Sequence, residues 1–234
     1  TETCPLSQTD CRLINKYDMK RCLIASLAFT FLLAGSMTLQ AQKIEKLFNG
    51  KDLSNWNFVV DKNSVPAEQV FSVKDGLIQV AGQPFGYMYT KEKYGNYKLH
   101  VEWRWPDGKT ANSGIFLLIE EPKNPFPNGV ECQLHAGDAG DFVLLGGSDL
   151  IEYQGKPGEP RPQFPVVKKH TDSTEKTPGE WNEANIFVKD GTITVYINGV
   201  YQNTGTNKVK EGFIGLQSEG GPVQFRNVTV VPFP

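Results

Sequence analysis

Apolar and polar residues alternate along most of the chain, and from about residue 43 onward the sequence is a series of short segments with a period of two. Such alternation is typical of β-strands that have one buried and one wet face. Three dipeptides separate alternating segments: Asp75-Gly76, Asp190-Gly191 and Asn198-Gly199. Because Asp-Gly and Asn-Gly favour two-residue hairpin turns, each predicts a pair of antiparallel strands. No sustained helical period follows residue 42, so the pattern predicts an all-β protein.

The expected strands are numerous enough for two sheets packed face to face. About ten strands in a domain of this size are typical of an antiparallel β-sandwich or jelly roll. The stretch 153–180 is rich in proline and charge and has no strand pattern, so we expect a long surface loop that crosses one face or edge. The expected strands are 70–73, 77–80, 86–90, 97–105, 114–120, 129–135, 142–145, 184–189, 192–198, 212–217 and 223–231.

The beginning of the chain has a different character. Residues 19–41 combine a basic start at Met19-Lys20-Arg21, an apolar run and a small residue, Ala41, at a cleavage position, as secretory signal peptides do. An uncleaved anchor is the alternative interpretation. Residues 1–18 show neither periodicity nor an apolar face, and we interpret them as an extension before the native start. We therefore expect one β-sandwich domain over residues 43–234, exported to the periplasm or cell surface, with no transmembrane anchor after processing.

The composition of the chain indicates an ordinary globular protein and argues against nucleic acid as a partner. The chain is 39% hydrophobic and 21% charged with a formal net charge of -2, which is ordinary for a globular protein and gives no basic surface for nucleic acid. The oligomeric state is left open. Of the four cysteines only Cys132 lies beyond residue 42, so the domain cannot form an internal disulfide. Cys132 falls on the apolar side of its expected strand, where it is expected to be a small buried side chain.

Two expected strands carry a polar residue at every second position. The segment "KLHVEWRW" places His100, Glu102 and Arg104 on one face, and "VECQLH" does the same with Glu131, Gln133 and His135. Their order in the sequence suggests that these strands are neighbours in one sheet. If so, the six side chains form a single patch that can hold a sugar by hydrogen bonds. The alternative is the wet face that antiparallel sheets commonly have.

No cofactor is expected from the motifs. A divalent metal at His100, His135 and Glu131 is conceivable, but none of these residues has the close spacing of a zinc motif. Asp138 and Asp141 lack the full spacing of an EF-hand loop. Serine nucleophile elbows and phosphate-binding glycine loops are absent from the sequence.

Several motifs, in order across residues 47–230, resemble the 3-keto-disaccharide hydrolase family, also called domain of unknown function 1080. The motifs are "LFNGKDLSNW", "NSGIF", "VECQL", "PGEWNEANIFV", "INGV" and "GFIGLQSEGGPVQFRNVTV". The resemblance implies the two-sheet jelly roll of concanavalin A-like lectins and glucanases. It also implies a hydrolase or lyase that cleaves the glycosidic bond of a glycoside whose C3 hydroxyl has been oxidised to a ketone.

The implied chemistry needs one well-placed base. The ketone acidifies the C2 proton, so a base can remove it, the C1 substituent can leave by elimination, and water can add afterwards. Glu131 is the preferred base and His135 the second choice. We expect Arg104, His100 or a bound metal to stabilise the enolate oxygen. Other residues are expected to bind the substrate: Glu102, Asn112, Gln133, His170 and Trp181.

Other functions remain open at this point. An ordinary glycosidase of this fold would need two carboxylates. The glucanase strand pattern Glu-x-Asp-x-x-Glu is broken here by Gln133 and Ala136, unless Glu102 supplies the acid from a neighbouring strand. A carbohydrate-binding module without catalysis could use the same polar patch, and a structural or adhesion role is a third possibility.

Overall fold

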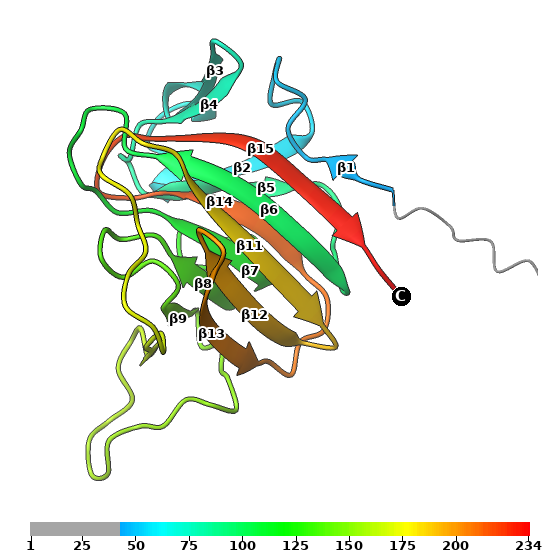
Figure 1. Ribbon diagram of the computed structural model, residues 1–234. Helices are drawn as coiled ribbons and strands as arrows, with labels where there is room; N and C mark the ends of the chain where they lie inside the picture. The colour runs from blue at the N-terminus through cyan, green and yellow to red at the C-terminus, as the bar shows by residue number, and fades with distance from the viewer. Residues whose placement is uncertain (1–42) are drawn as a thin grey trace, which may run out of the picture. The chain divides into compact units, whose positions relative to one another are not determined.

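Two antiparallel sheets make up the part of the chain described by the computed structural model, residues 43–234. Figure 1 shows the eight-stranded sheet, which we call sheet A, in front of the seven-stranded sheet B. This all-β sandwich confirms the predicted fold class. The expected extension and signal segment, residues 1–41, lie outside the described residues.

Sheet A has the strand order β13-β12-β11-β6-β15-β4-β3, with β1 paired to β15. Its strands are β1 (Glu45–Lys46), β3 (Phe71–Lys74), β4 (Leu77–Val80), β6 (Tyr97–Arg104), β11 (Asn182–Lys189), β12 (Thr192–Ile197), β13 (Val200–Thr206) and β15 (Val223–Pro232).

Sheet B has the order β10-β9-β8-β7-β14-β5-β2. Its strands are β2 (Trp56–Val60), β5 (Gly86–Thr90), β7 (Gly114–Ile119), β8 (Gly129–Gln133), β9 (Phe142–Leu145), β10 (Val166–Val167) and β14 (Phe213–Ser218). Two short 3-10 helices, η1 (Asp61–Asn63) and η2 (Ala67–Gln69), follow β2.

The three predicted hairpin turns are all present. Asp75-Gly76 joins β3 to β4, Asp190-Gly191 joins β11 to β12, and Asn198-Gly199 joins β12 to β13. All six residues have positive φ, from 50° at Asp190 to 83° at Gly191. Type I′ turns require positive φ at both central positions, which is why these dipeptides occur here.

The main core lies between the sheets and follows the alternation of the strands. On β6 the side chains of Leu99, Val101 and Trp103 are fully buried, whereas His100 and Glu102 between them are partly exposed. Cys132 is buried in the same core, as predicted, and burial raises the pKa of its thiol. A second cluster of buried apolar side chains covers the outer face of sheet B: Tyr87, Phe116, Ile119, Val143 and Leu145.

The chain changes sheet between β6 and β7, which the sequence order did not predict. β6 pairs with β11 and β15 in sheet A, whereas β7 pairs with β8 and β14 in sheet B. Residues 105–113 make this crossing. Consecutive strands are neighbours only about two-thirds of the time, and here a longer connection replaces the tight turn that would join two strands of one sheet. The expectation that β6 and β8 belong to one sheet is therefore wrong.

The stretch 153–180 is a loop for most of its length, as predicted, and Figure 1 shows its first part projecting from the sandwich. Two features differ from the prediction or extend it. Val166 and Val167 form β10, which pairs with β9 and lies at the edge of sheet B. Phe164 packs against the apolar cluster on the outer face of sheet B. The loop therefore covers part of that face.

Candidate functional site

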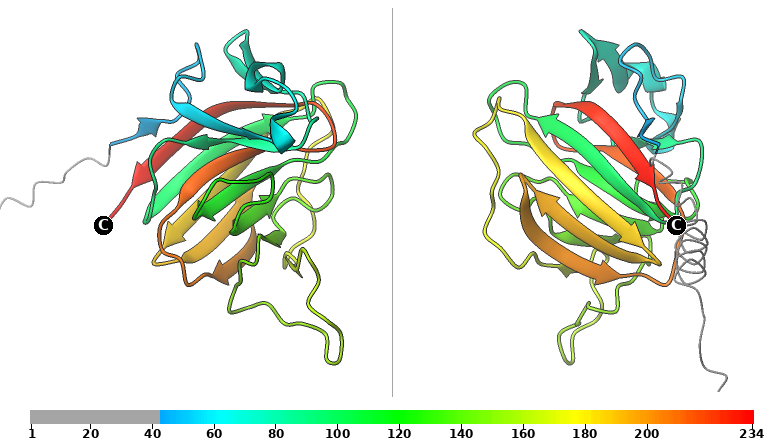
Figure 2. Two further views of the ribbon diagram at one scale, coloured as in Figure 1. Left: turned by 180° about the vertical axis from the view of Figure 1, so that it is seen from behind. Right: turned by 45° about the vertical axis from the view of Figure 1, so that its right-hand side comes forward.

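Glu131 lies on the outer face of sheet B, not beside the polar row of β6. Its neighbours on β8, Val130 and Cys132, point into the core between the sheets. Glu131 itself pairs in register with Phe116 of β7, which belongs to the outer apolar cluster. Although it is a carboxylic acid, Glu131 is only 3% exposed. Figure 2, left, views the molecule from the side of sheet B.

The space for the Glu131 side chain is provided by a glycine. A Cβ atom at Gly114 would lie 2.2 Å from Glu131 Oε1 and 2.7 Å from its Cγ and Cδ. Gly114 directly precedes Ile115, which pairs with Leu216, so it lies beside Gln217 of β14. The carboxyl group therefore extends over β7 toward β14.

Two residues of the last motif complete the surroundings of Glu131. Gln217 is 1% exposed on the outer face of β14, and its Nε2 donates a hydrogen bond to Glu219 Oε2 at 2.8 Å. Glu219 is half-buried. Neither residue was among the predicted site residues, although "LQSEGG" continues the alternation of β14 and places Gln217 and Glu219 on one face.

The charge of Glu219 affects the protonation of Glu131. Burial raises the pKa of Glu131 well above its ordinary value, and the charge of Glu219 raises it further. Burial also raises the pKa of Glu219, against the opposing effects of Gln217 and His135. A raised pKa moves the protonation equilibrium of a carboxyl group toward neutral pH, which is the direction that a general acid or base needs.

Four buried oxygen atoms at this place have no hydrogen-bond partner. Among the residues from 43 onward, eight buried side-chain nitrogen or oxygen atoms lack a partner. Four of them belong to residues around Glu219: Tyr87 Oη, Asn112 Oδ1, Glu131 Oε1 and Gln217 Oε1. Tyr87 pairs in register with Gln217, and Asn112 forms a β-bridge with Glu219. We call these five residues the Glu131 cluster. Since buried polar groups in folded proteins are nearly always paired, such a concentration of unpartnered oxygens distinguishes this cluster from the rest of the described sandwich.

His135 follows β8 and lies close enough to Glu219 to lower its pKa. Its Nδ1 lies 3.1 Å from Asp138 Oδ2. The carboxylate of Asp138 accepts a hydrogen bond from Nδ1–H, which leaves Nε2 free for another partner. The side chain of His135 is 52% exposed, so it reaches solvent at the end of the strand.

Gln133 has a local structural role. Its Oε1 accepts hydrogen bonds from the backbone N–H groups of Leu134 and His135, both at 2.9 Å. These bonds shape the chain as it leaves β8 and so position His135. That Gln133 also binds substrate stays a prediction.

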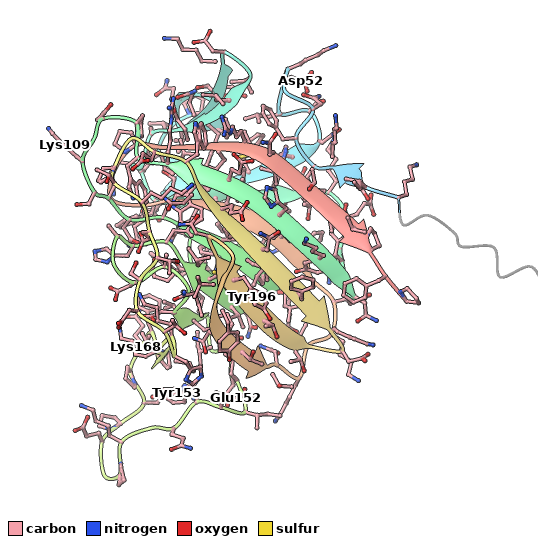
Figure 3. The ribbon with its side chains drawn as sticks, viewed as in Figure 1. Asp52, Lys109, Glu152, Tyr153, Lys168 and Tyr196 are labelled. Atoms are coloured by element: carbon pink, nitrogen blue, oxygen red, sulfur yellow. The ribbon has the colours of Figure 1, made fainter. Side chains whose placement is uncertain are left out.

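The loop from Leu134 to Asp141 is held by the segment that follows β10. Asp141, 2% exposed, accepts hydrogen bonds from Lys168 Nζ at 2.7 Å and from the backbone N–H of Lys169 at 2.8 Å. Glu175 Oε2 accepts a 2.8 Å hydrogen bond from the backbone N–H of Gly137. Figure 3 labels Lys168 on this side of the molecule. Part of the long loop thus fixes the turn that carries His135.

The polar row of β6 lies on the other side of the sandwich. His100, Glu102 and Arg104 occupy the outer face of sheet A, where their partners come from β11 and β15. Arg226 Nε donates to Glu102 Oε2 at 2.7 Å, and Arg104 Nε donates to Gln224 Oε1 at 2.7 Å. The six side chains therefore do not converge on one hollow, and the prediction of a single patch is wrong.

Trp181 and His170 also contact residues of sheet A. The Trp181 ring lies 4.7 Å from the Arg104 guanidinium and 4.0 Å from that of Arg226. His170 stacks on Tyr201 of β13 with 6.2 Å between ring centroids. The predicted site residues thus fall into two groups: Glu131, His135 and Asn112, with Gln133 between the first two, accompany sheet B, whereas His100, Glu102, Arg104 and Trp181 lie together on the outer face of sheet A.

The three residues considered as metal ligands from the sequence, His100, His135 and Glu131, do not lie together. His100 lies on the outer face of sheet A and Glu131 on the outer face of sheet B, so they cannot share an ion. Within residues 43–234 no group of three or more His, Cys, Asp or Glu side chains is arranged to hold a metal. In the same range no helix has the length and apolar character needed to cross a membrane.

Comparisons with known proteins agree with this fold. A solved structure of a candidate glycosyl hydrolase from Parabacteroides distasonis ATCC 8503 matches with a TM-score of 0.60 and 25% identity, over 83% of this chain and 95% of that protein. The carbohydrate binding module CBM66 from Bacillus subtilis matches with a TM-score of 0.51 and 13% identity, over 76% of this chain and 95% of the module, which shows the fold alone. The class is thus the β-sandwich of glycosyl hydrolases and carbohydrate-binding modules.

The particular family follows from the sequence. Residues 43–231 match the family described as 3-keto-alpha-glucoside-1,2-lyase-like domain, and the chain belongs to it. A 3-keto-disaccharide hydrolase from Bacteroides thetaiotaomicron is 25% identical over 79% of this chain and 76% of its own length. The resemblance noted from the motifs is confirmed.

Proposed function

We propose that this protein cleaves the glycosidic bond of a 3-keto-glycoside, with Glu131 removing the proton from C2. The observation that carries the proposal is the Glu131 cluster, in which a buried carboxyl group with a raised pKa is surrounded by unpartnered oxygens. Membership of the 3-keto-alpha-glucoside-1,2-lyase-like family supplies the substrate class.

The reaction proceeds through proton abstraction and elimination. Glu131 takes the C2 proton, which the adjacent ketone makes acidic, and the electron pair of the C2–H bond becomes the C1=C2 bond. The C1–O bond breaks, and the departing oxygen takes a proton from His135. Water then adds across C1=C2: its oxygen bonds to C1, its surplus proton goes to His135, and Glu131 returns its proton to C2, which gives the free keto-sugar. His135 suits the role of acid because Asp138 holds Nδ1 and Nε2 remains available.

Substrate binding would satisfy the remaining oxygens of the cluster. Asn112 Oδ1 and Gln217 Oε1 are acceptors without a donor, and sugar hydroxyls are donors. The Tyr87 hydroxyl is the candidate donor to the ketone oxygen as negative charge develops on it. Arg104 and His100, which the sequence suggested for this task, lie on the outer face of sheet A.

The test compares matched glucosides and 3-keto-glucosides. We expect the wild-type protein to turn over only the oxidised member of each pair. Glu131→Gln should lower kcat by about 10²–10⁴-fold, the usual contribution of a general base, without loss of the fold. Undiminished turnover by Glu131→Gln would place the base elsewhere, and turnover of neither substrate would favour a binding module.

A conventional two-carboxylate glycosidase is the second candidate. It is favoured by one observation, the electrostatic coupling of Glu131 and Glu219 on the same face. Glu102, the partner considered from the sequence, lies on sheet A and cannot take this role. The same substrate pairs separate the two functions, because a conventional glycosidase would hydrolyse the unoxidised glucoside.

Export to the periplasm or cell surface is part of the proposal. Its basis is the signal-like segment 19–41. The amino-terminal sequence of the protein recovered from the cell envelope should begin close after Ala41, whereas recovery of the intact chain from the cytoplasm would contradict export.

A further inference from the structure

The outer face of sheet A carries polar and aromatic residues that the proposed reaction does not use. β11 contributes alternate residues to this face: Glu183, Asn185 and Phe187, preceded by Trp181 with the same alternation. We call these four residues the β11 face. Six residue steps of extended chain lead from Trp181 to Phe187, a distance of about 20 Å. Two aromatic side chains thus mark the ends of a row whose centre is polar.

Two hollows lie along this row. The first, of about 280 Å³, is lined by Glu102, Lys176, Trp181, Glu183, Asn198 and Arg226, among others. The second, of about 520 Å³, is lined by Lys98, Asn185, Phe187, Thr194, Tyr196 and Gly199. Glu183 lines one hollow and Asn185 lines the other. Since these two side chains are neighbours on the same face of β11, the hollows follow each other along the strand.

The Trp181 end is held in place by charged neighbours. The guanidinium groups of Arg104 and Arg226 lie 4.7 Å and 4.0 Å from the ring, and their Nε atoms are fixed by Gln224 and Glu102. Lys176 Nζ donates to the Trp181 carbonyl at 2.9 Å. An indole held in this way loses little freedom when a ligand binds, which favours recognition.

The Phe187 end is an exposed group of aromatic rings. Phe187 is 37% and Tyr201 36% exposed, and both are edge-on to Tyr196 between them, with 5.9 Å between centroids in each pair. Tyr196 is labelled in Figure 3 on this side of the molecule. Large exposed aromatic side chains gathered on one face commonly mark a binding surface.

The polar groups between the two ends are already ordered. His100 Nδ1 lies 3.1 Å from Asn185 Oδ1. Although burial opposes the charged form, hydrogen bonds from Asn227 and Arg226 lower the pKa of Glu102, so it stays ionised. Planar amide, carboxylate and guanidinium groups offer both donors and acceptors along the row.

We propose that the β11 face binds a neutral oligosaccharide chain, at a site separate from the Glu131 cluster. Each sugar ring has apolar C–H faces that pack on aromatic rings and a rim of hydroxyls that pair with planar polar groups, which is the order found from Trp181 to Phe187. A protein partner fits less well, because charged residues are depleted from the centres of such interfaces and this row has charges in its middle. The site does not depend on which reaction takes place at Glu131.

The test is affinity electrophoresis of the full chain in native gels that contain hydroxyethyl cellulose, laminarin, xyloglucan or dextran. We expect retarded migration in at least one of these neutral polysaccharides. Trp181→Ala and Phe187→Ala should each weaken the retardation by about tenfold or more in Kd. Val166→Ala, which replaces an exposed residue of β10 in sheet B, should keep it. Circular dichroism and thermal unfolding verify that the variants are folded.

Three results would overturn the proposal: no retardation in any of the gels, equal retardation of both aromatic variants and the wild type, or a change of oligomeric state in Phe187→Ala that marks the face as a contact between two copies. Phe187 is exposed, so its replacement does not threaten the fold. Turnover of small 3-keto-glucosides is measured separately, so failure of this site and failure of the proposed reaction can be distinguished.

Discussion

The carboxyl group of Glu131 is buried, where the ionised form of a side chain is unfavourable. Burial raises its pKa, so the protonated form suits the folded protein better than the ionised form. Protonated Glu131 therefore contributes to the free energy of unfolding. This contribution is fully present below the pKa that Glu131 has in the unfolded chain, and it is lost as the pH rises through its higher pKa in the folded protein.

Glu131→Gln should therefore stabilise the protein above that folded-state pKa. Each kcal/mol gained in the free energy of unfolding should raise Tm by about 2–4 °C. The difference should disappear in acid, where the wild-type carboxyl is protonated too. Calorimetry from acid to alkaline pH measures this, and a pH-independent difference would show that the charge at Glu131 is not the cause.

The charge of Glu219 should affect the pH dependence of the reaction. Its negative charge raises the pKa of Glu131, so Glu219→Gln should lower that pKa. The base form of Glu131 then exists at lower pH, and the acidic limb of the kcat/KM profile should move to lower pH. Glu159→Gln, in the exposed part of the long loop, is the matched control and should leave the limb in place. A shift to higher pH would contradict the assignment.

Gly114 gives the sharpest steric test. Its φ is not in the positive range, so alanine is compatible with the backbone, but the new Cβ would lie 2.2 Å from Glu131 Oε1. Gly114→Ala should displace the carboxyl and lower kcat/KM by about 100-fold, with a loss of about 1–3 kcal/mol from overpacking. Gly155→Ala, whose Cβ would make only ordinary contacts at 3.8 Å, should change neither quantity.

At the scale of elements, the turn after β8 depends on a distant segment. Glu175 accepts hydrogen bonds from the N–H groups of Gly137 and Ala139, at 2.8 Å and 3.4 Å. Glu175→Ala should leave these donors to solvent, speed their hydrogen exchange and reduce kcat by allowing His135 to move. Exchange measured by NMR or mass spectrometry tests this, and unchanged protection at Gly137 and Ala139 would contradict it. Lys156→Ala, in the projecting part of the loop, serves as a control.

Sequence patterns predicted some elements better than others. The hairpins at Asp75-Gly76, Asp190-Gly191 and Asn198-Gly199 were predictable because positive φ leaves few residue choices. β13 was missed because its "QNTGT" segment lacks the β-branched apolar residues that reveal a strand, and its stability comes from pairing with β12. β10 was missed because two residues carry no period.

At the scale of the whole molecule, the sequence predicted which face of its strand each site residue occupies, but not which sheet that strand joins. Alternation correctly placed Glu131 opposite Cys132, and His100 opposite Leu99, on their own strands. Alternation is a local property, however, and does not reveal which sheet a strand joins. The crossing at residues 105–113 separates the two rows, and the replacement partners, Gln217 of β14 and Glu219 just after it, lie about 85 residues further along the chain.

The interior of the sandwich offers a probe of the whole fold. Cys132 is completely buried and its thiol pKa is raised, so it is unreactive in the native protein. The peptide that carries Cys132 should resist iodoacetamide under native conditions and become labelled together with the loss of β-sheet circular dichroism in denaturant. Mass spectrometry of that peptide measures both, and rapid native labelling would show that the core opens locally.

The absence of a side chain at Gly114 makes positions 114 and 131 depend on each other, although they are not paired in register. Glu131 occupies the volume that a methyl group at position 114 would need, so relatives that carry alanine there must have a shorter residue, or a differently directed acid, at position 131. Substitutions at the two positions should consequently be accepted together and rejected singly, and a collection of related sequences should record this as covariation.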